Sequence, residues 1–110
     1  MSFETRYSET TPSPDEVSGI AGPMLLEFGT DWCGHCRAAQ PLIAAAMAEH
    51  PSVRHLKIMD GPGLPLGRSF RVTLWPTLVF LRDGAEVSRL VRPRSGADID
   101  EALAAIGSPT

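Results

Sequence analysis

The chain has 110 residues, of which 43% are apolar, and a formal net charge of −3, so we expect one globular domain with a single core. The acidic balance argues against nucleic-acid partners, and no apolar run approaches the length that spans a membrane. The N-terminus lacks the basic and apolar regions of a secretory signal, which favours a cytoplasmic protein, expected to be a monomer.

The N-terminal part predicts little regular structure before one short helix. Residues 1–12 are expected to be a weakly ordered start, with at most a short strand over 3–7, and 107–110 to be a tail. A helix should follow, because Ser13 and Glu16 have the spacing of a capping box.

The next element is a strand over Met24 to Phe28, an apolar run that predicts a buried, central position. Its one charged residue is Glu27. A carboxylate in a buried strand is costly unless it is paired, hydrogen-bonded or protonated, so this residue indicates either a functional role or an edge position facing solvent.

Both cysteines follow this strand, in the segment Asp31-Trp32-Cys33-Gly34-His35-Cys36, and an alanine-rich helix is predicted over 37–49. The pair would therefore lie where a strand meets a helix. A helix N-terminus carries roughly half a positive charge and unpaired N–H groups, which stabilise a thiolate, the reactive form of cysteine. We expect Cys33 to attack disulfides and Cys36, one turn later, to resolve the mixed disulfide.

Three residues near the pair are interpreted as catalytic or conformational helpers. Gly34 allows a tight turn, and His35, when protonated, adds a positive charge near the Cys33 thiolate. Glu27 is interpreted as the proton acceptor for Cys36 during disulfide exchange.

Two other interpretations of the cysteines are that they are inert, or that they bind zinc together with His50 and His55. Zinc is disfavoured, because the cysteines open a helix and Pro51 should end the helix between the two histidines. We therefore expect no metal and no organic cofactor, and histidines that are solvated or lightly packed.

The remaining segments predict an α/β fold. Val53 to Met59 alternates like a strand, in which Lys57 either pairs with Glu27 or faces solvent. Further expected elements are a short helix at 66–71, strands at 78–81 and 86–91 joined by a turn at 82–84, and a helix at 95–107. The order β-α-β-α-β-α-β-β-α predicts a central mixed sheet, with parallel crossovers first, an antiparallel hairpin last, and helices on both faces.

This pattern resembles the thioredoxin family from about residue 3 to 106. Trp32 to Cys36 matches the family's active-site motif, in the form with histidine that disulfide-isomerase domains have and where thioredoxin itself has proline. Pro41 matches the helix-kinking proline, and Glu27 stands at the place of the buried acid of disulfide isomerases. Trp75-Pro76-Thr77 matches the segment that carries a cis-proline.

The resemblance implies a thioredoxin fold and a thiol–disulfide oxidoreductase that acts on disulfide-containing proteins and needs an electron donor, which the sequence does not identify. It also implies a cis peptide before Pro76 and substrate contacts at Trp32, Gly34, Trp75 and Pro76. A redox-sensitive peptide-binding module with little turnover is the alternative. The histidine predicts a better oxidant than the proline form.

Two departures from thioredoxin concern the expected substrate groove. Trp75 is bulky for the position before the cis-proline, so we expect it to narrow or reshape the groove. Leu74 and Arg92 stand roughly where thioredoxin has glycines in its docking surface, which predicts a poor fit to the partners of ordinary thioredoxins.

Overall fold

A four-stranded mixed sheet lies at the centre of the computed structural model, which describes residues 6–107. The strands are β1 (Pro23–Gly29), β2 (Arg54–Met59), β3 (Thr77–Arg82) and β4 (Ala85–Val91), in the spatial order β2-β1-β3-β4. β1 runs parallel to β2 and antiparallel to β3, and β3 pairs antiparallel with β4. The predicted mixed sheet with a closing antiparallel hairpin is confirmed.

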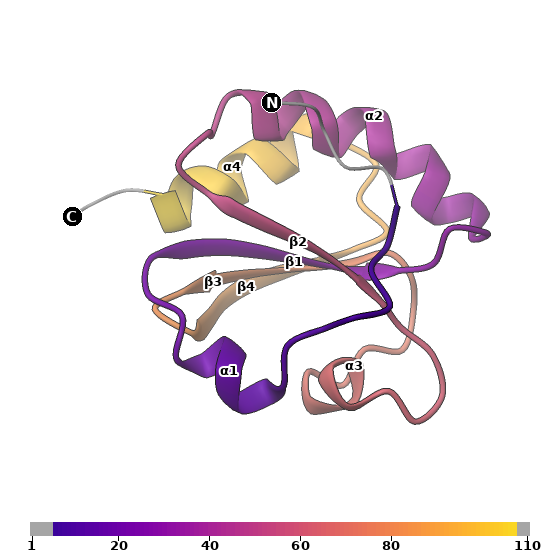
Figure 1. The fold of residues 1–110 in the computed structure, drawn as a ribbon. Helices are drawn as coiled ribbons and strands as arrows, with labels where there is room; N and C mark the ends of the chain where they lie inside the picture. Colours follow the sequence, from indigo (N-terminus) through magenta and orange to yellow (C-terminus); the bar gives the residue numbers. More distant parts are fainter. Residues whose placement is uncertain (1–5, 108–110) are drawn as a thin grey trace.

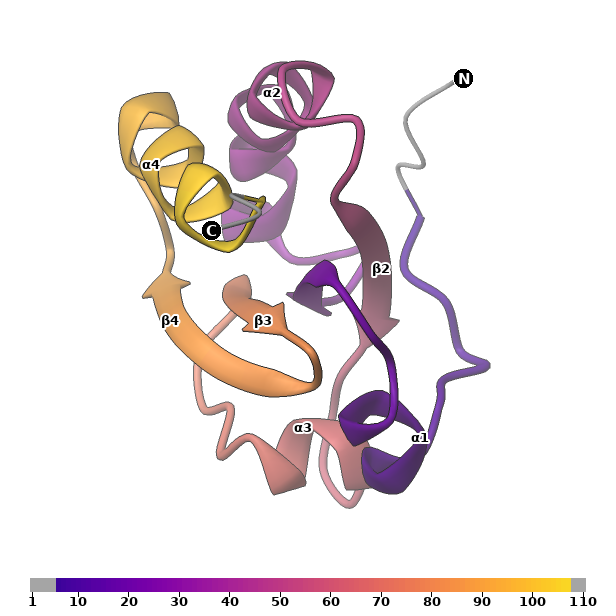
Figure 2. The same ribbon diagram turned by 90° about the vertical axis from the view of Figure 1, so that its left-hand side faces the viewer.

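Helices cover both faces of this sheet, as predicted. They are α1 (Pro14–Ser18), α2 (Gly34–Ala48), α3 (Pro65–Ser69) and α4 (Gly96–Gly107). The long helices α2 and α4 lie together on one face, and the short helices α1 and α3 lie on the other (Figure 1). Figure 2 shows the same two layers from the side, with α2 beside α4. None of the helices in the described range is long and apolar enough to span a bilayer.

The alternation of side chains along β1 places Glu27 on a particular face. Leu25 packs in the core beneath α2 and α4, whereas Met24, Leu26 and Phe28 pack in the core on the side of α1 and α3. Successive strand residues point to opposite faces, so Glu27 shares the face of Leu25 and points toward α2. The strand is central and Glu27 is fully buried, so the alternative of an exposed edge position is wrong.

The described part of the N-terminal segment, from residue 6 onward, follows the edge of the sheet. Residues 3–5 lie outside the described range, and residues 6 and 7 have no strand structure. Ser8 instead forms an isolated parallel bridge with Ile58 of β2. This bridge runs the chain along the edge of the sheet and leaves the side chain of Tyr7 buried.

Local signals place the two ends of α2 close to their predicted positions. The helix begins at Gly34, three residues earlier than predicted, because Cys33 is its N-cap and accepts a hydrogen bond through its side chain. Pro41 lies inside the helix on its exposed side. The predicted capping box of α1 is confirmed, since Ser13 and Glu16 bond to each other's backbone.

Candidate active site

The two cysteines lie at the N-terminus of α2, and both are free thiols in this structure. The backbone N–H of Cys36 donates a hydrogen bond to the Cys33 sulfur over 3.2 Å. Cys33 is partly exposed, whereas Cys36 is fully buried behind it. A sulfur that solvent can reach, next to unpaired N–H groups at a helix N-terminus, is suited to act as a thiolate nucleophile.

Cys36 lies in surroundings that keep its thiol protonated. Burial raises the pKa of Cys36 to about 12, with further contributions from the hydrogen bond and charge of Cys33. A backbone contact with Thr30 and the Tyr7 hydroxyl act in the opposite direction but do not reverse the shift. Cys36 therefore needs a base close by before it can attack another sulfur.

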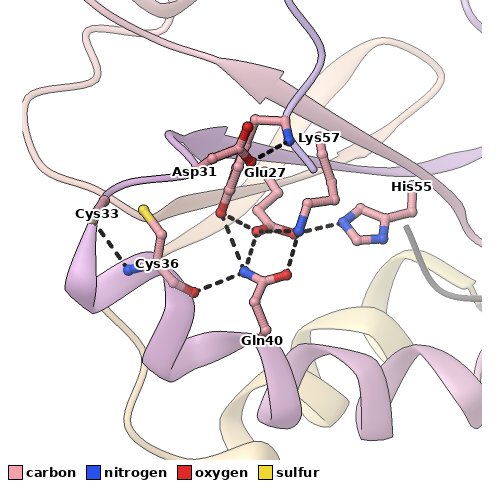
Figure 3. A network of polar contacts seen from close by, with 8 residues as sticks. Glu27, Asp31, Cys33, Cys36, Gln40, His55 and Lys57 are labelled. Atoms are coloured by element: carbon pink, nitrogen blue, oxygen red, sulfur yellow. Dashed lines mark hydrogen bonds and ion pairs between the residues drawn. The ribbon is translucent and has the colours of Figure 1, made fainter. Parts of the chain in front are cut away.

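Glu27 is at the centre of a buried polar network beneath α2 (Figure 3). One carboxylate oxygen, Oε1, lies 2.8 Å from Nε2 of His55. The other, Oε2, accepts hydrogen bonds from Gln40 Nε2 at 2.9 Å and from the Tyr7 hydroxyl, and lies 3.3 Å from Lys57 Nζ. The two possibilities for Lys57 are thus resolved in favour of pairing with Glu27.

This network keeps the Glu27 carboxylate ionised. Burial acts to raise the pKa of Glu27, but the hydrogen bond with His55, the charge of Lys57 and the hydrogen bonds from Gln40 and Tyr7 together lower it below its ordinary value. A carboxylate that is charged at neutral pH and sealed from water can accept a proton from a neighbouring group.

Tyr7 and Gln40 belong to this network, although the sequence did not single them out. The backbone N–H of Tyr7 donates to Asp31 Oδ1 over 3.0 Å, which anchors the segment beside the cysteines. Gln40 Nε2 also bonds the Cys36 carbonyl at 2.8 Å and lies 3.3 Å from the Tyr7 hydroxyl oxygen. Tyr7 is distant from Glu27 along the chain and has no motif around it, so only the fold reveals this contact.

The opposite side of Cys33 is formed by the segment before β3. The Trp75–Pro76 peptide is cis, as the family resemblance implied, and Pro76 is buried. The Trp75 carbonyl oxygen lies 4.0 Å from Cys33 Sγ and accepts a 2.9 Å hydrogen bond from Arg92 Nε. The Trp75 indole N–H donates to Asp60 Oδ2 over 2.9 Å, so this large ring is fixed by the loop after β2.

The exposed side of the motif presents three of the predicted site residues to solvent. Trp32 is 69% exposed, and Gly34 and His35 are exposed on the first turn of α2. Their positions next to Cys33 leave them accessible to a docked protein.

The two remaining histidines, His50 and His55, contact different carboxylates. His50 pairs with Asp100 of α4 at 2.6 Å. The prediction of a solvated or lightly packed His55 is wrong, because its side chain is 12% exposed and contacts Glu27. Within residues 6–107, no three histidine, cysteine or acidic side chains converge as metal ligands would.

Comparisons with known proteins show which family the chain belongs to. The family described as Thioredoxin matches residues 9–105. Thioredoxin from Chlamydia trachomatis serovar D is 38% identical over 72 residues, which are 64% of this chain and 70% of that protein. Protein disulfide-isomerase A2 from Pongo abelii is 48% identical over 65 residues, which are 56% of this chain but only 12% of that much longer protein.

A solved structure extends the similarity to almost the whole chain. Thioredoxin 2 from Pseudomonas aeruginosa PAO1, in its reduced form, has a TM-score of 0.86 and 58% identity, and the match covers 96% of this chain and 97% of that one. The predicted fold and the predicted chemistry of the C-x-x-C pair are thereby confirmed. The chain belongs to the thioredoxin family and is a thioredoxin-type thiol–disulfide oxidoreductase with the pair Cys33 and Cys36.

Proposed function

We propose that Cys33 is the nucleophile and Cys36 the resolving thiol in the reduction of protein disulfides. The Cys33 thiolate attacks one sulfur of the substrate disulfide, that bond breaks, and the departing sulfur takes a proton. Cys36 then attacks Cys33, so that the second substrate sulfur leaves and an intramolecular Cys33–Cys36 disulfide remains. An upstream dithiol donor restores the reduced pair.

One observation carries this assignment. The Cys33 sulfur is partly exposed and accepts the Cys36 N–H at the start of α2, while the Cys36 sulfur is buried behind it. The two thiols therefore differ in access, and only Cys33 can meet a substrate first. We assign the Trp75–Pro76 segment to the substrate side, because the Trp75 carbonyl faces Cys33 and can pair with an extended peptide.

We further assign to Glu27 the role of proton acceptor for Cys36. Glu27 is held in its ionised form, so its carboxylate is free to receive a proton, and its place beneath α2 excludes competing water. Trp32 and Gly34 are assigned to substrate contact from their exposed positions beside Cys33.

The histidine at position 35 supports a more oxidising pair than that of ordinary thioredoxins. His35 lies on the first turn of α2, and in its protonated form it would stabilise the Cys33 thiolate, and thus the dithiol form, over the disulfide. We propose that the protein acts in the cytoplasm, where C-x-x-C pairs serve mainly as exchange catalysts.

The assignment is tested by insulin-disulfide reduction with dithiothreitol as the donor. We expect rapid reduction by the natural protein and none above background by Cys33→Ser. Cys36→Ser, mixed with insulin in the absence of dithiothreitol, should form a mixed disulfide that persists. Peptide binding without turnover in the natural protein would instead support a binding module.

The role of His35 is tested separately by titration against glutathione buffers. We expect the His35→Pro variant to have a lower reduction potential than the natural protein. An unchanged or higher potential in this variant contradicts the role assigned to His35.

A further inference from the structure

The Tyr7 side chain lies between Glu27 and Cys36. Its hydroxyl donates a hydrogen bond to Glu27 Oε2 in the buried network. The same hydroxyl lies close to the Cys36 sulfur at Gly29, and each of the two groups influences the pKa of the other. The carboxylate and the resolving thiol are thus connected through one phenol group.

Gly29 shows how closely the sulfur and the hydroxyl approach each other. A Cβ atom placed on Gly29 would lie 2.6 Å from Cys36 Sγ and 2.9 Å from the Tyr7 hydroxyl oxygen. Both atoms therefore occupy the same small space above the end of β1. A larger residue at this position would separate them or displace one of them.

We propose that Tyr7 is a catalytic residue that relays a proton from the Cys36 thiol to the Glu27 carboxylate during the resolving step. The proposal rests on the roles proposed for Cys36 and Glu27 and adds the group that joins them. It thereby gives a catalytic role to the N-terminal segment that carries Tyr7, which lies along the outer edge of the sheet.

The step balances in protons and electrons. As Cys36 Sγ forms its bond to Cys33 Sγ, its proton moves to the Tyr7 oxygen, and the Tyr7 proton moves to Glu27 Oε2. The bond between Cys33 and the substrate sulfur breaks, and the electron pair leaves with the substrate thiolate. Cys36 is a weak acid and Glu27 a weak base, so the proton must move while the sulfur–sulfur bond forms.

The surroundings of Tyr7 suit a relay that never ionises. Burial and the Glu27 charge raise the pKa of Tyr7 well above its ordinary value, so the hydroxyl keeps one proton throughout. Gln40 Nε2 lies 3.3 Å from the hydroxyl oxygen and holds its position. The ammonium of Lys57 lies 4.4 Å from the centre of the Tyr7 ring and fixes the plane of that ring.

The charged and titratable groups around the hydroxyl come from several elements. Glu27 faces the hydroxyl from β1 and Cys36 from α2, while Lys57 of β2 lies over the Tyr7 ring. His55, also on β2, contacts the far oxygen of Glu27. In this arrangement the Cys36 thiol is the proton source. Among the described residues, the Glu27 carboxylate is the only anion that bonds the Tyr7 hydroxyl directly.

The relay is tested with Tyr7→Phe, which removes the hydroxyl and keeps the ring. Reaction of the reduced protein with 5,5′-dithiobis(2-nitrobenzoate) releases one thionitrobenzoate when Cys33 attacks and a second when Cys36 resolves. We expect the first phase to be unchanged and the second to be slower by about 10²-fold, the lower end of the usual contribution of acid–base catalysis.

The pH profile of the second phase separates proton relay from a packing defect. In the natural protein the rate should be nearly constant from about pH 6 to about pH 9, because Glu27 is ionised throughout and serves as an internal base. In Tyr7→Phe the rate should rise about tenfold per pH unit, because hydroxide must then remove the Cys36 proton. If the variant were slow only because of a packing defect, raising the pH would not restore the rate of its second phase.

Matched variants complete the test. Ser8→Ala, which removes an exposed hydroxyl bonded to the Thr10 carbonyl, should leave both phases unchanged. Glu27→Gln should slow the second phase as Tyr7→Phe does, and the double variant should be no slower than either. A second phase that is normal in Tyr7→Phe but slow in Glu27→Gln overturns the relay alone. A normal second phase in Glu27→Gln overturns the proposed role of Glu27 itself.

Discussion

The sulfur of Cys33 accepts the backbone N–H of Cys36 over 3.2 Å, so the helix that carries both thiols directs its N-terminal field at only one of them. We predict a large difference in their reactivity toward iodoacetamide near neutral pH. Cys33 should be alkylated at least about 10²-fold faster than Cys36, because Cys36 is buried and its pKa is raised to about 12. Peptide mass spectrometry after timed quenching measures both rates.

The control for this prediction is the urea-unfolded protein, in which both thiols should react at the same rate. Equal labelling in the folded protein would mean that Cys36 is accessible, and the assignment of two different roles would be wrong.

Arg92 is predicted to limit access to the Trp75 carbonyl. Its Nε bonds this oxygen at 2.9 Å, and its backbone has a φ of 50°, which favours glycine. Arg92→Gly should free the carbonyl for a substrate peptide and lower the KM for insulin by about fivefold, which corresponds to one hydrogen bond of about 1 kcal/mol. Steady-state reduction assays measure this change. Arg94→Gly is the matched control, and a higher KM for Arg92→Gly would show that the guanidinium itself binds substrate.

Any side chain at Gly29 is predicted to lower the stability of the protein. Gly29→Ala would place a methyl group 2.6 Å from Cys36 Sγ and should cost about 1–3 kcal/mol in the free energy of unfolding, as overpacking of a core usually does. Urea denaturation of the reduced protein measures this loss. Gly96→Ala is the control, because a Cβ there meets no atom within 4 Å. Equal stability of the two variants would contradict the close packing described above.

Lys57 is predicted to hold the Glu27 carboxylate in its charged form. Lys57→Met keeps the aliphatic stem but removes the ammonium, so the pKa of Glu27 should rise and the buried charge should lose a partner. Breaking a buried pair usually costs about 3–5 kcal/mol, although His55 and Gln40 remain to offset part of this loss. Urea denaturation and carboxyl NMR titration measure the two effects. An unchanged pKa of Glu27 would argue against a role for Lys57 in the network.

The stability of the reduced protein is predicted to fall on both sides of neutrality. The pKa of Glu27 is lower in the folded protein than its ordinary value of 4.5, so its stabilising contribution is present above that pH and is lost as the pH falls further. Cys36 and Tyr7 have raised pKa values, so their contributions are complete below the ordinary values of 9.0 and 10.0 and are lost as the pH rises beyond them.

Urea midpoints measured across the pH range test this prediction. Tyr7→Phe should flatten the alkaline decline, because the unfolded chain then has one fewer group to ionise. A midpoint that falls equally steeply in this variant would mean that Tyr7 does not contribute.

The sequence predicted those features of the site that are encoded by neighbouring residues. Cys33 and Cys36 lie together because a strand and a helix meet at their position, and Ser13 and Glu16 cap α1 because a capping box is local. The burial of Glu27 followed from the apolar run around it. These are short-range patterns whose period and spacing can be read directly.

Features that depend on the approach of distant segments were not predicted. Tyr7 is 20 residues from Glu27, and it is positioned by the bridge between Ser8 and Ile58 and by the hydrogen bond from its own backbone N–H to Asp31. His55 could be assigned to the Glu27 network only once the parallel register of β1 and β2 was known, since a shift of one residue turns it to the other face. The contact of Asp60 with Trp75 likewise joins two loops.

The pKa of Cys36 depends on the state of Cys33, and this dependence favours attack by Cys33 before attack by Cys36. Part of what raises the pKa of Cys36 comes from the hydrogen bond and charge of the free Cys33 thiol. Both should disappear when Cys33 is covalently joined to a substrate, so we expect the pKa of Cys36 to fall at that point. We therefore expect Cys36 to be least reactive while Cys33 is a free thiol, and to become more reactive once Cys33 has captured a substrate.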